Sequence, residues 1–348
     1  MPELPEVETV ARDLRGRIVG AVIVDATTHW ERTLRGISPE AFAEGVAGRR
    51  IEAVGRRAKQ LVVDLSGGAF LTIHLKMTGQ LFVVPQGGHE DPYVRLVLAL
   101  EDGREIRFRD IRKFGKIGLY LAERDDPFAA IGPEPLANEF TVRAFRRRIR
   151  ARKGRLKPLL LDQTFVAGVG NIYADEALWA SRLHPLRTAR TLRPADERRL
   201  WTEIRRILAE AVIRRGSSID DYTAPDGDGE MQDHLAVYQR TGEPCRRCGR
   251  PIKRIVVGAR ATHFCSWCQR LPAGDRPGAR AILRTMTGGE KRRRGRRWSE
   301  LPGGEGSTAP SGADPDRRSR GPAPAARAER TRRAAATRRA AARASVGG

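Results

Sequence analysis

The sequence predicts an α+β protein with an N-terminal antiparallel β-sandwich, a leading helix, a helical C-terminal part, a zinc ribbon and a disordered basic tail. Three observations predict this fold class. Short apolar runs separated by turn residues fill the first third of the chain, helical periodicity follows, and four cysteines cluster near residue 255. The domain boundaries we expect are 1–130, 131–240, 241–270 and 271–348.

The leading helix is predicted from the residues that follow Pro5. Val7, Val10 and Leu14 recur at helical spacing, and the acidic residues before them suit the positive end of a helix dipole. This start has neither the basic nor the apolar region of a signal peptide. No apolar run approaches the ~20 residues of a membrane span. We therefore expect a soluble, cytoplasmic protein.

The β-sandwich is predicted from seven short apolar runs. Ser66-Gly67-Gly68 and Asp102-Gly103 lie between runs as hairpin signals. Many short strands at this spacing are typical of a sandwich or a barrel. The runs are 22–24, 61–65, 69–75, 81–84, 94–100, 105–108 and 117–121.

The character of the sequence changes near residue 130. Residues 131–135 (Ile-Gly-Pro-Glu-Pro) predict a linker, and a loop rich in Asp, Gly and Ser covers residues 216–230. Beyond about residue 275 too few large apolar residues remain to offset the entropy of ordering, which predicts a disordered tail. Helical patterns lie at about 140–150, 156–163, 172–181 and 194–214.

The charge balance favours a polyanionic partner. The formal net charge is +23, from 65 basic and 42 acidic residues. Nucleic acid is the commonest partner for such an excess, and a merely solvated basic surface is the alternative. Residues 271–348 carry 19 Lys and Arg against 7 Asp and Glu, so the tail would add nonspecific attraction to phosphates.

The cysteines form two Cys-x2-Cys pairs with sixteen residues between them. Each pair can present two thiolates, and two pairs complete a tetrahedral zinc site. Four protein ligands leave no open position, so the metal would be structural. The residues between the pairs alternate enough for a two-stranded ribbon. The predicted ligands are Cys245, Cys248, Cys265 and Cys268.

Two further motifs are weak when taken alone. The glycines of Gly168-Val169-Gly170-Asn171 precede a helical pattern and could offer backbone N–H groups to a phosphate, or form a simple helix-entry turn. Phe114 stands beside Arg112 and Lys113, an arrangement that suits a wedge entering a base stack. A packed phenylalanine between solvated charges is the plainer interpretation.

The N-terminus offers an unusual nucleophile. Removal of Met1 would leave Pro2 with a free secondary amine. An α-amino group titrates near ~8, far below a lysine at ~10.4, so much of it is unprotonated close to neutral pH. Attack of this amine on a sugar C1′ gives an iminium, which is the electron sink for eliminating phosphate. Glu3 and Glu6 could shuttle protons, although a plain acidic helix start remains possible.

Together these segments resemble the formamidopyrimidine-DNA glycosylases. The resemblance rests on residues 1–9 (Met-Pro-Glu-Leu-Pro-Glu-Val-Glu-Thr), residues 168–176 (Gly-Val-Gly-Asn-Ile-Tyr-Ala-Asp-Glu) and the cysteine module. It covers about residues 1–270, and the tail lies outside it. It implies a helix–two-turns–helix domain after the sandwich, with DNA in the cleft between the two.

The resemblance also implies the catalytic residues. Pro2 matches the nucleophile that forms a Schiff base with the sugar, and Glu3 matches the acid that protonates the ring oxygen. Glu6 matches a supporting carboxylate. Lys59 matches a hairpin lysine that holds the phosphate beside the lesion.

The same resemblance implies the residues that contact DNA. Met77, Arg112 and Phe114 match side chains that fill the gap left by an everted base, with Arg112 facing the orphaned cytosine. Residues 216–235 match a loop that closes over the lesion. The implied backbone contacts are His74, Lys157, Asn171 and Arg260, and the implied loop contacts are Ser217, Ser218 and Tyr222.

The implied function is a bifunctional DNA glycosylase and AP lyase, acting as a monomer on damaged double-stranded DNA. It would excise oxidised purines and then cleave by β- and δ-elimination, with one structural zinc ion. One alternative is the sister family of endonuclease VIII, which acts on oxidised pyrimidines. The other is a noncatalytic DNA-binding protein on the same scaffold. The residues Leu4 and Met77 and the long loop favour purines, and Pro2, Glu3 and Lys59 favour catalysis.

Overall fold

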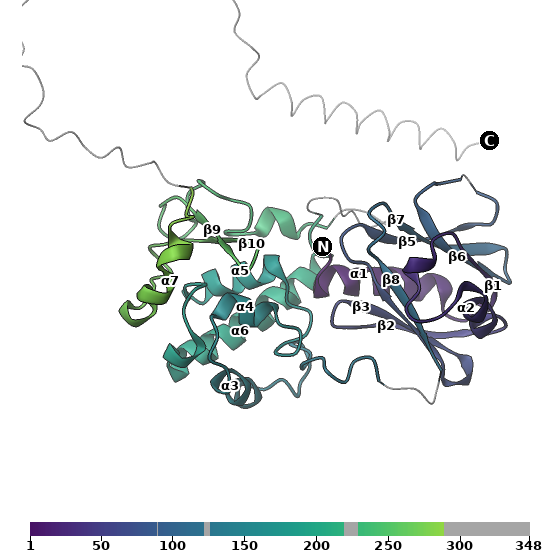
Figure 1. Ribbon diagram of the computed structural model, residues 1–348, viewed down its shortest axis with the longest axis horizontal. Coiled ribbons are helices and arrows are strands. Elements are labelled where there is room, and N and C mark those ends of the chain that lie inside the picture. Colours follow the sequence, from purple (N-terminus) through teal and green to yellow (C-terminus); the bar gives the residue numbers. More distant parts are fainter. Residues whose placement is uncertain (89, 122–125, 219–228, 289–348) are drawn as a thin grey trace, which may run out of the picture. The chain divides into compact units, whose positions relative to one another are not determined.

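A computed structural model describes residues 1–88, 90–121, 126–218 and 229–288 (Figure 1). Its N-terminal part consists of antiparallel sheets and its C-terminal part of helices followed by a two-stranded ribbon, which confirms the predicted fold class. Among the described residues, no helix has both the length and the apolar character needed to cross a membrane.

The N-terminal part contains two four-stranded antiparallel sheets whose inner faces share one apolar core. Buried side chains alternate with partly exposed ones along residues 60–65 and along much of strands 94–100 and 104–110, as expected for a sandwich. The first sheet has the order β1 (Ile23–Thr28), β6 (Val94–Leu100), β7 (Arg104–Asp110) and β5 (Gly79–Pro85). The second has the order β2 (Ile51–Arg57), β3 (Gln60–Leu65), β4 (Phe70–His74) and β8 (Lys116–Tyr120).

Helix α1 (Leu4–Ile18) belongs to both parts of the molecule, and its start lies between the sheets and the helices of the C-terminal part (Figure 1). From Val7 onward its buried side chains pack into the core of the sandwich. Leu4 packs instead into the core of the helical part, beside Tyr173 and Val169. The first turn of α1 is therefore fixed by both cores, because Leu4 is buried in the helical core and Val7 is buried in the core of the sandwich.

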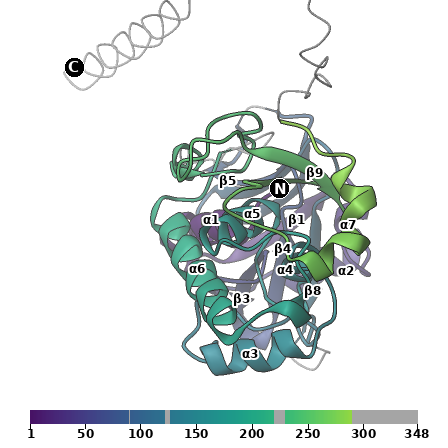
Figure 2. The same ribbon diagram turned by 90° about the vertical axis from the view of Figure 1, so that its left-hand side faces the viewer.

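The helical part has a core of its own, built on α3 (Val142–Arg150), α4 (Leu156–Leu161), α5 (Asn171–Ala180) and α6 (Pro194–Ile213). Helices α5 and α6 pack together, and α3 packs near the start of α6 (Figure 2). The ribbon consists of β9 (Lys253–Val257) and β10 (Arg260–Phe264), and β10 contacts α5. Short 3₁₀ turns lie at Glu31–Thr33, Ser66–Gly68, Ala189–Thr191, Met231–His234 and Ala273–Asp275.

Three elements were not predicted from the sequence. Strand β2 and helix α2 (Pro39–Val46) were missed, and α7 (Arg276–Leu283) lies within the segment assigned to the tail. Helix α7 is ordered because Ala279 is buried against the ribbon and Thr287 pairs with Arg254 of β9. The tail assignment is therefore wrong for residues 271–288, and residues 289–348 lie outside the described residues.

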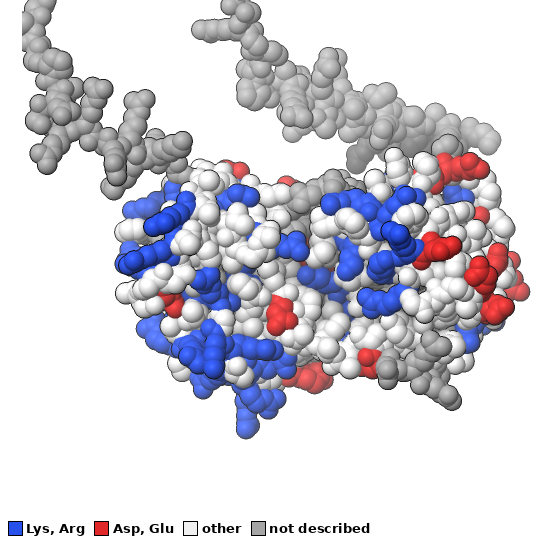
Figure 3. Space-filling model, in the orientation of Figure 1, with Lys and Arg blue, Asp and Glu red and all other residues white. Residues whose placement is uncertain are grey.

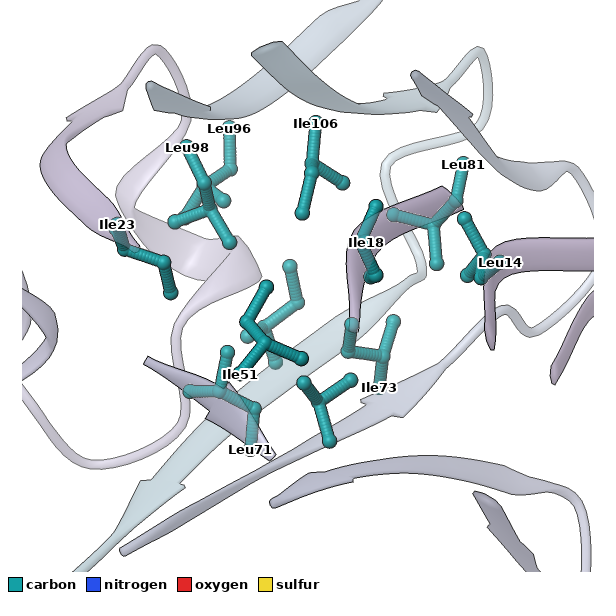
Figure 4. A pocket seen from close by; sticks show the side chains of 12 residues that line it. Leu14, Ile18, Ile23, Ile51, Leu71, Ile73, Leu81, Leu96, Leu98 and Ile106 are labelled. Carbon is teal, nitrogen blue, oxygen red and sulfur yellow. The ribbon is translucent and has the colours of Figure 1, made fainter. Parts of the chain in front are cut away.

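The interior of the sandwich encloses a small cavity of about 20 Å³ (Figure 4). Leucine, isoleucine and valine side chains from both sheets and from α1 line it, including Leu14, Ile51, Leu98 and Ile106. A cavity of this size with only apolar walls offers water no hydrogen bonds, so it should stay dry. When a lining side chain is truncated, water is therefore not expected to fill the enlarged cavity.

We expect Leu98→Ala to lower the free energy of unfolding by about 2–5 kcal/mol, because it enlarges this cavity. Urea denaturation followed by circular dichroism measures the change. The matched control is Val24→Ala on the neighbouring strand β1, where the valine is exposed and a change within about 0.5 kcal/mol is expected. Equal effects of the two substitutions would contradict this description of the core.

Candidate active site

The carboxylate of Glu3 binds the first turn of helix α5. Its oxygens accept hydrogen bonds from the backbone N–H groups of Gly170 at 2.7 Å and Ile172 at 2.8 Å. The N–H of Tyr173 lies 3.4 Å away as a weaker third donor. These N–H groups have no partner within the helix, and the helix dipole favours a negative charge at this end. The carboxylate thus acts as the anion that the start of α5 requires.

The glycine turn before α5 makes this contact possible. A Cβ atom on Gly170 would lie 2.3 Å from Cδ of Glu3, so only glycine leaves room for the carboxylate. The sequence had suggested that the N–H groups of this turn bind a DNA phosphate. That interpretation is corrected for Gly170 and Ile172, because both groups are already bonded to Glu3.

Glu6 connects the N-terminal residues to two distant segments. One carboxylate oxygen accepts the backbone N–H of Glu3 at 2.8 Å. The other accepts the hydroxyl of Tyr173 at 2.6 Å and the backbone N–H of Ser217 at 2.8 Å. Tyr173 was not singled out from the sequence, although it lies inside the motif of residues 168–176. All of these groups are buried. Glu6 therefore joins three segments of the chain in the interior: the N-terminus, helix α5 and the segment that begins at Ser217.

Ser217 and Ser218 lie at the base of the segment predicted to close over a lesion. Ser218 donates its backbone N–H to the side chain of Gln232 and accepts the N–H of Gly229 at 2.9 Å, so the two ends of this segment are joined. Tyr222 lies outside the described residues.

Lys59 lies in the tight turn between β2 and β3 and is almost fully buried. The preceding residue, Ala58, has a φ of +54°, a left-handed conformation that costs roughly 1–2 kcal/mol for a residue with a Cβ atom. The carboxylate of Glu134 stabilises this turn by accepting the N–H of Ala58 at 2.6 Å. Glu134 also pairs with Arg56 and Arg57 of β2, so the linker holds the hairpin that carries Lys59.

The buried charges of this site shift one another's protonation. Burial raises the pKa of the Glu3 carboxyl, the cation of Lys59 opposes this shift, and the charge of Glu6 adds to it. Burial also lowers the pKa of the Lys59 amine, against the attraction of Glu3 and Glu6. The positive charge of Arg260 lowers it further. Pro2, which directly precedes Glu3 in the chain, is buried.

The three predicted wedge residues come from two loops at one end of the first sheet. Met77 precedes β5, while Arg112 and Phe114 follow β7, and β5 and β7 are neighbours in the sheet. Phe114 is 52% exposed, and the guanidinium of Arg112 lies 5.2 Å from the centre of its ring. The structure therefore brings these residues together at one edge of the sandwich.

His74, at the end of β4, is neutral at physiological pH. Burial lowers its pKa to about 3, and the nearby cation of Lys76 acts in the same direction. Its Nδ1 accepts the backbone N–H of Lys76 at 3.1 Å, which leaves the ring proton on Nε2. His74 can therefore donate one hydrogen bond to a phosphate but cannot contribute a charge.

Lys157 lies in the protein interior, although the family resemblance had implied that it contacts the DNA backbone. Its side chain is 0% exposed, and its ammonium binds the carboxylate of Asp175 at 2.5 Å and the carbonyl of Asn171 at 3.0 Å. The prediction that it contacts the DNA backbone is therefore corrected. Asp175 also accepts the backbone N–H of His263 in β10, so this buried pair ties the ribbon to α5.

Asn171 and Arg260 are held at the same junction of α5 and the ribbon. The side-chain amide of Asn171 donates to the carbonyl of Ala261 at 3.1 Å. Arg260 is exposed at the first position of β10, in the turn of the ribbon. The junction therefore fixes the direction in which the ribbon turn points.

The four cysteines come together as predicted. Their Sγ atoms all lie within 4.8 Å of one another, and those of Cys248 and Cys265 are 3.5 Å apart. Zn–S bonds of about 2.3 Å in a tetrahedron place sulfur atoms roughly 3.8 Å apart. The indole N–H of Trp179 in α5 lies 3.4 Å from Sγ of Cys245. The cluster fits one structural zinc ion, with no position left for a substrate.

Comparison with known protein families identifies this arrangement. Three family models match the chain, and together they cover most of the described residues. They are the formamidopyrimidine-DNA glycosylase N-terminal domain over residues 1–117, the formamidopyrimidine-DNA glycosylase H2TH domain over 131–223, and the zinc finger found in FPG and IleRS over 242–271. The chain belongs to the formamidopyrimidine-DNA glycosylase family.

Members of this glycosylase family match over nearly their whole length. The formamidopyrimidine-DNA glycosylases of Chloroflexus aurantiacus and Herpetosiphon aurantiacus are 48% and 46% identical, and each match covers 77% of this chain and 98% or 100% of the relative. A crystal structure of a Lactococcus lactis FPG variant with a Fapy-dG containing DNA has a TM-score of 0.73 at 38% identity. That match covers 77% of this chain and 100% of the solved chain.

The buried position of Lys157 generates a prediction that separates a framework role from a DNA contact. We expect Lys157→Met to lower the free energy of unfolding by about 3–5 kcal/mol, because it leaves the carboxylate of Asp175 buried without its cation. Urea denaturation measures the effect. The matched control is Lys153→Met, an exposed lysine just after α3, for which a change within about 0.5 kcal/mol is expected.

A direct phosphate contact would give a different result. In that case Lys157→Met would remain as stable as the wild type, and the dependence of DNA affinity on salt concentration would become less steep.

Proposed function

We propose that this chain is a bifunctional DNA glycosylase and AP lyase that removes oxidised purines from damaged double-stranded DNA. One observation carries the proposal: Pro2 directly precedes Glu3, whose buried carboxylate is coupled to Lys59. The names of the relatives support the same activity, as does the Fapy-dG containing DNA bound to the Lactococcus protein. Because the matching relatives are bacterial proteins and the proposed substrate is chromosomal DNA, we propose that the protein acts in the cytoplasm.

The proposed reaction begins with the amine of Pro2, after removal of Met1. The amine nitrogen attacks C1′ of the damaged nucleotide, the bond from C1′ to the base breaks, and the base leaves with a proton. Glu3 protonates the ring oxygen and so assists opening of the sugar. The resulting iminium draws electrons from C2′, and successive eliminations release the 3′ and 5′ phosphates.

The protein surface supplies the contacts that this reaction needs. Lys59 in the turn between β2 and β3 and Arg260 in the turn of the ribbon hold the phosphates beside the lesion. His74 donates one neutral hydrogen bond to the backbone. Figure 3 shows Lys and Arg side chains gathered over α3, while a group of Asp and Glu side chains lies over α2 and β1 at the opposite edge. Such a distribution favours a polyanion on one part of the surface.

Met77, Arg112 and Phe114 enter the stack when the damaged base turns out. Unstacking costs on the order of a few kcal/mol, and less for a lesion than for a normal pair, which contributes to selection. The zinc ion keeps the ribbon folded so that Arg260 points toward the DNA. With four cysteine ligands it has no open position and takes no part in bond breaking.

We expect borohydride to trap the wild-type protein covalently on duplex DNA that contains 8-oxoguanine, because it reduces the iminium on Pro2. Pro2→Gly should lose at least about a hundredfold in trapping rate, equivalent to about 2.7 kcal/mol of barrier. Denaturing gels measure the trapped complex. Pro39→Gly, at the first position of α2, is a matched control that should trap normally.

Two outcomes would count against this assignment. Undiminished trapping by Pro2→Gly would remove the nucleophile. Mass spectrometry that finds Met1 retained in an active preparation would do the same. Equal cleavage of matched duplexes containing thymine glycol would instead favour the activity of endonuclease VIII.

The raised pKa of Glu3 predicts how the reaction depends on pH. A raised pKa keeps the carboxyl protonated to higher pH than usual, so the excision rate should fall as pH rises through that pKa. Single-turnover excision rates across the pH range measure this fall. Glu3→Gln should be slow and its rate should not fall with rising pH. Glu44→Gln, at an exposed position on α2, should show the same fall as the wild type. A rate profile of Glu3→Gln that still falls with pH would assign the fall to another group.

A further inference from the structure

The two loops that carry the wedge residues leave the sheet side by side. Gly79, the first residue of β5, pairs with Asp110, the last residue of β7. Residues 75–78 therefore lie directly beside residues 111–114, although more than thirty positions separate them in the sequence. The first loop carries Met77, and the second carries Arg112 and Phe114.

A buried hydrogen-bond network joins the bases of these loops. The hydroxyl of Thr78 donates to Oδ1 of Asp110 at 2.5 Å, and the backbone N–H of Gly115 donates to Oδ2 at 2.7 Å. The N–H of Arg112 lies 3.2 Å from both Oδ1 of Asp110 and Oγ1 of Thr78. Thr78 and Asp110 are both almost fully buried, so water does not compete for these bonds.

The backbone of each loop contains one strained residue. Lys76, just before Met77, has a φ of +56°, and Lys113, between Arg112 and Phe114, has a φ of +60°. Each left-handed residue costs roughly 1–2 kcal/mol and persists only where its surroundings hold it. The ammonium of Lys113 lies 4.1 Å from the centre of the Trp30 ring, which holds that residue from outside the loop. A Cβ atom on Gly115 would lie 2.3 Å from the ring of Phe108, so the second loop has no room to shift inward.

The tip of the second loop nevertheless exposes large apolar side chains to water. Ile111 is 46% exposed and Phe114 is 52% exposed. A rigid base beneath an exposed apolar tip is the form that suits insertion into a base stack. Among the described residues, the hydrogen bonds of this network join only the two loops and the ends of the strands that carry them, so the network acts through the loops.

We infer that Thr78 and Asp110 are positioning residues that make the two wedge loops move as one rigid unit during base eversion. This inference rests on the proposed function, because it assigns the platform on which the insertion of Met77 and Phe114 depends. Without the Thr78 hydroxyl, the loop carrying Met77 loses its bond to the loop carrying Arg112. Arg112 then faces the orphaned base less accurately, since its own N–H is held by the same two residues.

The test compares Thr78→Val, which removes the hydroxyl at nearly constant volume, with Thr78→Ser, which restores it. The control is Thr33→Val, because the hydroxyl of this buried threonine has no hydrogen-bond partner among the described residues. Single-turnover rates are measured on full-length protein with two duplexes. One carries 8-oxoguanine opposite cytosine or adenine, and the other carries a preformed abasic site.

We expect Thr78→Val to excise 8-oxoguanine opposite cytosine about tenfold more slowly, the effect of one buried hydrogen bond on a barrier. The preference for cytosine over adenine should narrow, while cleavage of the preformed abasic site stays within about twofold, since the Pro2 chemistry is intact. Thr78→Ser should restore both the rate and the preference. Thr33→Val should behave as the wild type.

Several results would overturn the inference. One is normal excision and an unchanged base preference in Thr78→Val. Another is an equal loss on both duplexes, which would mean that the substitution merely damages the fold. If Thr78→Val does not fold, Thr78→Ala and Asp110→Asn carry the same comparison. Failure of the wild type to cleave any of these duplexes would sink the proposed function instead, which separates the two failures.

Discussion

The bond between Glu3 and the start of α5 fixes the chain's first residues against a helix that lies about 170 positions away in the sequence. Hydrogen bonds to a charged group contribute about 1.5–3 kcal/mol each, more than neutral ones. The bond is possible because Gly170 has no side chain and because α1 begins immediately after Glu3. Glu6 then extends the same contact to Tyr173 and Ser217. Glu3 and Glu6, the two groups proposed to move protons, therefore both depend on the contact between α1 and α5.

The sequence predicted the architecture well wherever local patterns carried the information. Apolar alternation located strands β3 to β8, and helical periodicity located α3 to α6 within a few residues. Strand β2 escaped notice because its second half is Arg56 and Arg57, whose charges are neutralised by Glu134 from the linker. Helix α2 could have been found, since Ser38 caps it and Pro39 occupies its first position.

The sequence predicted which residues belong to the site better than it predicted which of them bind one another. The cysteine spacing alone specified the zinc ligands, and the N-terminal motif pointed to Pro2, Glu3 and Glu6. Lys157 shows the limit of that reasoning, because a lysine in a basic sequence gives no sign that its partner is Asp175 in the interior. The N–H groups of the glycine turn had two interpretations from the sequence, a phosphate site or a simple helix-entry turn. Their true acceptor, Glu3, lies too far away in the sequence for any local pattern to show it.

Helix α1 packs into both cores and begins almost at the chain terminus. The proposed chemistry therefore depends on where the chain starts. In the proposed reaction the nucleophile is the amine of the chain terminus, and this terminus directly precedes the first turn of a helix that is buried in two cores. A circularly permuted chain, opened at an exposed hairpin such as Asp102-Gly103, could keep every contact of the fold and still possess no amine beside Glu3. Under the proposed mechanism, an extension at the carboxyl end leaves this amine in place, whereas a fusion at the amino end removes it.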